Sequence, residues 1–166
     1  MRAAIDACFR AGLRLAWLGL RAYFAIFRPK IRASVVLVHW EGQLLLVTNS
    51  YRKGQGFPGG MLKWREDPRQ GACRELEEEV GLAIRPDGLH FLGVFVRKEW
   101  GAEIELHAFG LEFDQEPTPE IDQREVVEAV FFSVEEAARR LPESRDLIER
   151  FAEAGSMLVR SPAEGT

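Results

Sequence analysis

The sequence predicts a sandwich of the α/β or α+β class, in which helices pack against a β-sheet. Short segments rich in β-branched residues alternate with segments of helical period, and glycine-containing loops separate them. A length of 166 residues suits one domain with a terminal appendage. The hydrophobic fraction of 46% and the charged fraction of 29% are those of an ordinary soluble protein with a real core.

Residues 1–30 are predicted to form an amphipathic helix of unusual charge. They hold six basic side chains and one acid, although the whole chain carries −4. At about 100° per residue the charged side chains fall along one stripe, and the rest of the helix surface is apolar. The stripe consists of Arg2, Asp6, Arg10, Arg14, Arg21 and Arg28.

Three environments suit such a helix: a groove of its own domain, the seam of a homodimer, or an anionic membrane surface with the arginines at headgroup level. The interspersed arginines exclude a membrane-spanning helix, and no cleavage site for a signal peptide follows. Pro29 ends the helix, because proline disfavours helical geometry in the preceding residue. Removal of residues 1–28 is expected to change self-association or membrane binding more than catalysis.

The remaining elements follow from local signals. Glu41-Gly42 is a turn between two strands, and residues 49–60 contain four glycines and a proline, which predicts a loop. Asp67 is a suitable N-cap for a helix that begins at Pro68, and Gly81 ends it. The predicted strands are 31–40, 43–48, 89–98, 103–113 and 126–132, and the further helices are 133–141 and 143–154.

The helix over residues 68–80 carries the candidate chemistry. Glu75, Glu78 and Glu79 share a face about 100° wide, opposite an apolar face formed by Cys73, Leu76 and Val80. Three carboxylates within two turns repel one another, and a divalent cation such as Mg²⁺ removes that repulsion. Taken alone, the acidic run also fits a solvated helix face.

The surrounding spacing favours the metal site. Gly60 is followed after five residues by Glu66, and after seven more by Arg74-Glu75-Leu76-Glu77-Glu78-Glu79-Val80-Gly81-Leu82. This matches every defined position of the Nudix box, so the chain resembles the Nudix hydrolase superfamily. The resemblance covers residues 31–141 and implies the α/β class, as a Nudix-type α/β/α sandwich with a mixed sheet. It divides the chain into the helix at 1–30, a Nudix domain at 31–157 and a flexible tail at 158–166.

The resemblance also implies the reaction and its residues. Members hydrolyse a pyrophosphate bond in a nucleoside diphosphate linked to another moiety, by water attack on phosphorus, and need Mg²⁺, for which Mn²⁺ substitutes. The metal positions are matched by Glu75, Glu78 and Glu79, and the backbone of the Gly59-Gly60 turn is a further ligand. Arg74 and Glu66 match orienting residues. The general base of the family varies, which leaves Glu75 first and Glu125 and Glu128 as alternatives.

The substrate is less well defined. Arg52 and Lys53 either steer phosphates or are solvated loop cations, and Trp64 and Trp100 either stack on a base or pack on the domain. Arg65 stands where the family usually has glycine, which affects loop geometry and not metal binding. The residues after the box carry neither of the markers typical of ADP-ribose or dinucleoside-polyphosphate hydrolases.

The expected partner is therefore a small nucleotide-type molecule, and the acidic body offers no electrostatic footprint for nucleic acid such as 5′-triphosphorylated RNA. The alternative class is a nucleotide-binding regulatory module without turnover, although such modules usually lose box residues and this box is complete. Two cysteines without a CxxC pair favour a reducing, cytoplasmic setting, with membrane association through residues 1–28 left open.

Overall fold

A computed structural model describes residues 2–121 and 123–158 of the chain. The elements, in chain order, are α1 (Arg2–Phe27), β1 (Lys30–Trp40), β2 (Gln43–Asn49), β3 (Gln55–Gly56), β4 (Gly59–Met61), α2 (Pro68–Val80), the 3₁₀ turn η1 (Pro86–Gly88), β5 (His90–Glu99), β6 (Ala102–Glu112), β7 (Val126–Ser133), α3 (Val134–Arg140), the 3₁₀ turn η2 (Pro142–Ser144) and α4 (Arg145–Leu158). The predicted tail lies outside the described residues, apart from Leu158 at the end of α4.

The strands form one mixed sheet in the order β3-β2-β1-β6-β5, with β4 added to β1 and β7 to β2. β1 and β6 run parallel from the pair Lys30–Glu103 to the pair His39–Glu112. The other pairings among the described residues are antiparallel. The mixed sheet predicted by the resemblance is confirmed.

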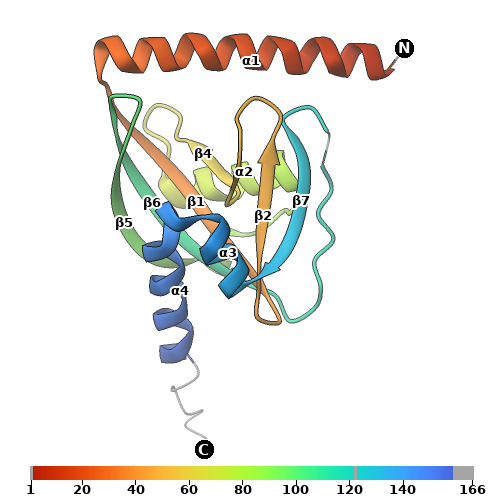
Figure 1. Cartoon of the computed structure of the whole chain (residues 1–166). Coiled ribbons are helices and arrows are strands. Elements are labelled where there is room, and N and C mark those ends of the chain that lie inside the picture. The colour runs from red at the N-terminus through yellow and green to blue at the C-terminus, as the bar shows by residue number, and fades with distance from the viewer. Residues whose placement is uncertain (1, 122, 159–166) are drawn as a thin grey trace, which may run out of the picture.

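Helices cover both faces of this sheet, with α2 behind it and α3 and α4 in front (Figure 1). Alternation along β1 divides the core between the two faces. Val36 and Val38 pack with Leu76 and Val80 of α2, whereas the α3 and α4 side is filled by a second cluster. That second cluster contains Val35, Leu37, Ala137, Leu141, Leu147 and Ile148. The fold is the predicted α/β/α sandwich.

The segment predicted as a loop at 49–60 is more structured than expected, because it contains β3 and the start of β4. Gly59 has φ 148°, and a Cβ atom there would lie 2.2 Å from the carbonyl oxygen of Ser34. Only glycine lets the backbone pass β1 so closely, which explains how β4 pairs with β1. The glycines of residues 49–60 therefore indicate a close approach of β4 to β1 as well as turns.

α1 lies across one end of the sandwich, over the loop after β2, the β5–β6 turn and the segment before β7 (Figure 1). Part of its charged stripe contacts the domain. Asp6 pairs with Arg124 at 3.1 Å, and the Nε atom of Arg14 donates to the carbonyl oxygen of Ser50 at 3.0 Å. Phe24 is buried, and Arg28, with φ 47°, ends the helix before Pro29 as predicted.

The opposite side of α1 is uncovered. Leu15 and Ile26 are each 71% exposed, and Phe27 is 67% exposed. Within residues 2–121 and 123–158, no helix has the combination of length and hydropathy that a membrane span requires. The helix thus contacts the domain through part of its polar stripe and through Leu13, Trp17, Leu20 and Phe24, and leaves the rest of its apolar surface outward.

Candidate functional site

Local sequence signals place the candidate catalytic helix α2. The side chain of Asp67 accepts hydrogen bonds from the backbone N–H groups of Arg69 and Gln70, and Pro68 occupies the first turn. Gly81 closes the helix in the left-handed conformation with φ 69°, and its N–H donates to the carbonyl oxygen of Glu77. Both predicted ends are therefore confirmed. Ala72, Leu76 and Val80 are buried against the sheet, which turns the acidic side chains toward β4 and the loop after β2.

Arg74 organises the acidic face. Its Nε and Nη2 atoms donate to the two carboxylate oxygens of Glu66 at 2.8 and 2.9 Å. Its Nη1 atom donates to Glu75 and to Glu78, at 2.8 Å each. This bidentate contact holds the pKa of Glu66 at about 2, with help from the Lys63 N–H, and the carboxylates raise the pKa of Arg74. One guanidinium therefore fixes three box carboxylates.

Glu79 occupies the most enclosed position of the cluster, with only 5% of its surface exposed. Its carboxylate accepts hydrogen bonds from the Gly59 N–H at 2.9 Å and from the Asn49 side-chain amide at 3.2 Å. Burial raises its pKa to about 7, and the nearby carboxylates of Glu75 and Glu125 act in the same direction. No cationic side chain of the described residues forms an ion pair with Glu79. The Glu79 carboxylate can therefore bind a cation, and no side chain of the described residues provides that cation.

Glu75 lies against the Gly60 backbone. A Cβ atom at Gly60 would lie 2.7 Å from the nearest carboxylate oxygen of Glu75, so glycine makes room for that carboxylate. Burial raises the pKa of Glu75, whereas Arg74 lowers it. The Gly59-Gly60 turn thus approaches both Glu75 and Glu79, which is the juxtaposition that the metal prediction requires.

The two alternative bases have different positions. Tyr51 contacts Glu125 through its hydroxyl group, and Glu125 also acts electrostatically on Glu75 and Glu79. Glu128 instead accepts a hydrogen bond from Thr48 at 3.0 Å, on the sheet face that carries α3 and α4. The structure brings Glu125 to the cluster and leaves Glu128 on the opposite face from α2.

The donor set suits a hard divalent cation, because Glu75, Glu78 and Glu79 offer carboxylate oxygens beside the Gly59-Gly60 backbone. Ser34, opposite Gly60 in the β1–β4 register, also has a buried hydroxyl group without a partner among the described residues. In the described part of the chain, no three acidic, histidine or cysteine side chains already surround one point. Arg74 holds Glu75 and Glu78, so a cation that bound both carboxylates would replace part of their contact with Arg74.

Three of the four predicted substrate residues share one cavity of about 740 Å³ under α1. Arg52, Lys53 and Trp100 line it, together with Arg14 and Trp17 of α1. Trp64 is separate: it is 89% exposed on the turn before α2, where the Arg65 guanidinium lies 5.7 Å from its ring. It therefore does not cover the core and does not line the cavity that contains the other three residues.

Asn49 and Tyr51 are site residues that the sequence analysis missed. Asn49 donates to Glu79 and accepts from the Nε atom of Arg52 at 2.9 Å, so it links the acidic cluster to the cationic loop. Burial raises the pKa of Tyr51, whose ring packs 5.3 Å from that of Trp17. Their position directly before the cationic pair at 52–53 was the available signal.

A sequence model of the NUDIX domain matches residues 28–151. An RNA pyrophosphohydrolase of Hydrogenovibrio crunogenus is 35% identical over 74 residues, which cover 45% of this chain and 41% of the relative. A second, from Alkalilimnicola ehrlichii, is 39% identical over 57 residues, which cover 34% and 30%. The chain thus spans less than half the length of these curated relatives.

Solved structures agree on the fold. The MutT protein of Methanosarcina mazei Go1 superposes with a TM-score of 0.65 at 22% identity, covering 77% of this chain and 96% of that one. The E. coli ORF135 protein has a TM-score of 0.60 at 25% identity, covering 83% and 97%. With the complete box and its geometry, these matches show that the chain belongs to the NUDIX domain family.

The raised pKa of Glu79 predicts how stability depends on pH when no metal is bound. Between the ordinary value of 4.5 and about 7, the folded state holds a proton on Glu79 that the unfolded state has lost. Stability therefore falls as pH rises through this window. Relative to a Glu79→Gln variant, we expect the free energy of unfolding of the wild-type chain to fall by roughly 2–3 kcal/mol between pH 5 and pH 8.

Urea unfolding of both proteins in the presence of a chelator, at a series of pH values, measures this difference. Glu66 does not interfere, because its pKa is lowered and its contribution changes only below about pH 4.5. Parallel stability curves for the two proteins would show that Glu79 does not titrate in this window.

Proposed function

We propose that the chain is a Mg²⁺-dependent pyrophosphohydrolase that cleaves a nucleoside diphosphate linked to another moiety, by water attack on phosphorus. The observation that supports this most directly is the single guanidinium of Arg74 fixing Glu66, Glu75 and Glu78, with buried Glu79 beside the Gly59-Gly60 turn. Glu75, Glu78 and Glu79, with a backbone carbonyl of that turn, would hold Mg²⁺ or Mn²⁺. Such a cation neutralises charge on the phosphate oxygens.

The protein groups have separate roles in this proposal. Arg74 and Glu66 orient the carboxylates, and the shared hydrogen bonds limit their freedom to rotate. Glu75 or Glu125 accepts the proton of the attacking water, and both carboxylates act on Glu79. The pKa of Glu75 is raised toward neutral pH, which suits a general base. Arg52 and Lys53 bind phosphate oxygens from the loop after β2. The free thiols Cys8 and Cys73 suit a cytoplasmic protein.

A substrate panel tests the proposal. Nucleotide sugars, ADP-ribose, dinucleoside polyphosphates, nucleoside triphosphates and 5′-triphosphorylated RNA are incubated with Mg²⁺ or with a chelator. Reaction in ¹⁸O-labelled water should place the label on a phosphate product. We expect turnover of at least one small nucleotide and loss of turnover with chelator. Tight nucleotide binding without turnover of any compound would instead indicate a regulatory module, and turnover restricted to RNA would agree with the names of the curated relatives.

We further propose that α1 rests on an anionic membrane surface. Its outward face carries no charged residue from Cys8 to Ile26, and Leu15 and Ile26 are largely exposed. Beneath one edge, a cavity of about 890 Å³ is lined by Arg21, Arg28, Lys30 and Lys98, which complement lipid phosphates. Glu103 is the acidic residue of that lining and pairs with Lys30 at 3.1 Å.

A double substitution tests membrane docking. Leu15→Glu with Ile26→Glu places two charges on the outward face and should reduce co-sedimentation with phosphatidylcholine–phosphatidylglycerol vesicles by at least about tenfold. Trp64→Glu, which removes an exposed aromatic residue elsewhere, should leave vesicle binding unchanged. A dimer in sedimentation equilibrium that the double substitution dissociates, without vesicle binding by the wild-type chain, would assign the face to a second copy instead.

A further inference from the structure

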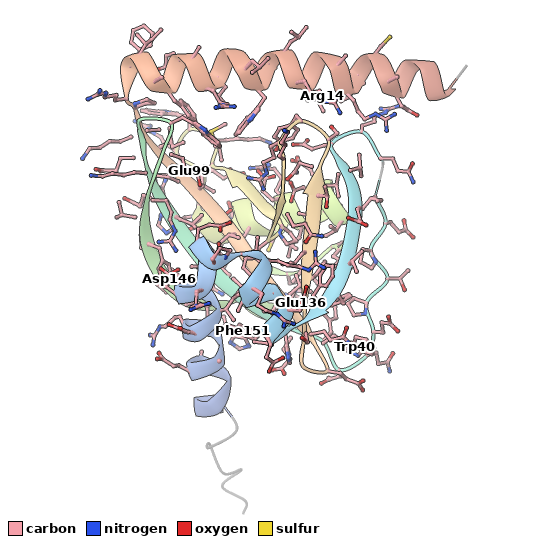
Figure 2. The ribbon with its side chains drawn as sticks, in the orientation of Figure 1. Arg14, Trp40, Glu99, Glu136, Asp146 and Phe151 are labelled. Carbon is pink, nitrogen blue, oxygen red and sulfur yellow. The ribbon has the colours of Figure 1, made fainter. Side chains whose placement is uncertain are left out.

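Two cavities flank Arg14 between α1 and the loop after β2. The smaller, of about 480 Å³, is lined by Arg10, Arg14 and Arg52, with no acidic residue among its described lining. The larger, of about 740 Å³, is lined by Arg14, Arg52 and two further cations, Arg21 and Lys53, against the acids Glu99 and Glu143. Figure 2 shows Arg14 on the side of α1 that faces the domain and Glu99 at the end of β5 nearest to α1. Cations from both segments therefore line one seam between α1 and the loop, namely Arg10, Arg14, Arg21, Arg52 and Lys53.

These cations lack carboxylate partners. Among the ion pairs of residues 2–121 and 123–158, none involves Arg10, Arg14, Arg21, Arg52 or Lys53. Arg14 and Arg52 are each held through Nε, by the carbonyl oxygen of Ser50 and the side-chain oxygen of Asn49. Holding a guanidinium through Nε leaves N–H groups of the two terminal nitrogens available to an anion.

The seam is connected to the acidic cluster and is structurally fixed. Asn49, which lines the smaller cavity, contacts both Arg52 and Glu79. The Trp17 ring of α1 packs at 5.3 Å from the Tyr51 ring and edge-on at 5.0 Å from the Trp100 ring. These aromatic contacts hold α1 over the loop, so its arginines do not have to be ordered when a ligand binds.

We propose that α1 and the loop at 49–53 together form a binding site for the phosphate chain of a small nucleotide with three or more phosphates. This inference rests on the proposed function. The pyrophosphate being cleaved is neutralised at the acidic cluster, so the cations of the seam, of which Arg52 is joined to Glu79 through Asn49, are useful to a substrate that carries further phosphates. The site distinguishes nucleoside triphosphates and dinucleoside polyphosphates from nucleotide sugars, whose only phosphates are the two at the cleaved bond. α1 is then part of the substrate site, which reverses the expectation that removal of residues 1–28 affects catalysis least.

The test compares substrates in one variant. Arg10→Gln with Arg14→Gln should raise KM for a nucleoside triphosphate by about tenfold or more, equivalent to about 1.4 kcal/mol of binding free energy. KM for a nucleotide sugar should change by less than about threefold. Arg14→Lys alone should recover part of the loss, and Arg85→Gln, an exposed cation outside the seam, should change neither constant. Equal changes for both substrates, or none, would overturn the proposal.

A binding measurement separates failure of this site from failure of the proposed function. Calorimetry with inorganic tripolyphosphate and Mg²⁺ should show binding to the wild-type chain that the double variant weakens by about tenfold, whether or not any substrate is turned over. Unchanged tripolyphosphate binding in a double variant that circular dichroism shows to be folded would overturn the anion site alone. A large preference for 5′-triphosphorylated RNA over a nucleoside triphosphate, lost in the same variant, would overturn the assignment to a small nucleotide.

Discussion

Glu79→Gln is expected to reduce turnover by more than about 100-fold, because loss of a residue that only orients a metal ligand already lowers activity by about 10- to 100-fold. The substitution keeps the shape of the side chain but removes the charge that a divalent cation would meet. It also places an amide N–H between two existing donors, the Gly59 N–H and the Asn49 amide. Initial rates on the best compound of the substrate panel measure the loss, and calorimetry with Mn²⁺ measures the accompanying loss of metal affinity.

Glu77→Gln is the matched control, because Glu77 lies on the same helix, carries the same charge and is exposed away from the cluster. It should keep the wild-type rate to within about twofold, as expected for an exposed substitution away from the reacting groups. Circular dichroism and thermal unfolding establish that both variants fold. A Glu79→Gln enzyme as active as Glu77→Gln would remove Glu79 from the metal site.

The parts of the site that sequence predicts correctly are those fixed by local interactions. α2 begins at Pro68 and ends at Val80 as predicted, because Asp67 caps one end and Gly81 the other within a few residues. Box spacing on a helix also determines that Arg74 can reach Glu78 four residues later. On a helix the residue number gives the direction of a side chain, so these positions could be predicted without knowledge of tertiary contacts.

Residues from β2 and β7 could not be assigned in the same way. The β2–β7 ladder pairs Thr48 with Glu128 but Asn49 with Val126, so one extra residue is inserted on β7. The bulge places Val126 on the α2 side of β7, whereas Glu128 lies in the regular part of the ladder and faces away from α2. The sequence alone does not show which face of β7 meets α2, which is why both Glu125 and Glu128 stayed candidates until the register was known.

The orientation of α1 was undetermined for a related reason. Its period gives a charged stripe and an apolar surface, and usual burial would turn the apolar surface inward. The structure shows a mixed contact face: Phe24 is buried and Leu13, Trp17 and Leu20 are half-buried, while Arg14 reaches the Ser50 carbonyl and Leu15 is exposed. The loop ends beneath α1 present a carbonyl group to Arg14 and aromatic rings to Trp17, which is why polar and apolar residues share the contact face.

Arg74→Lys is expected to give the second largest effect, a loss of activity of about 10- to 100-fold with a weaker response to Mg²⁺. Lysine retains the charge but cannot make the two parallel hydrogen bonds to Glu66 while also contacting Glu75 and Glu78. The pKa of Glu66 should then rise from about 2 toward its ordinary value of 4.5. The free energy of unfolding should fall by about 1.5–3 kcal/mol, the range for hydrogen bonds to charged groups.

A double-mutant cycle with Glu66→Gln separates orientation from a general loss of stability. If Arg74 acts through Glu66, the two substitutions together should cost little more activity than Arg74→Lys alone, because both break the same pair of hydrogen bonds. Rates are measured over a range of Mg²⁺ concentrations, and the half-saturating concentration should rise in each single variant. Independent, multiplicative losses with an unchanged response to Mg²⁺ would show that Arg74 supports the fold without aiming the carboxylates at a cation.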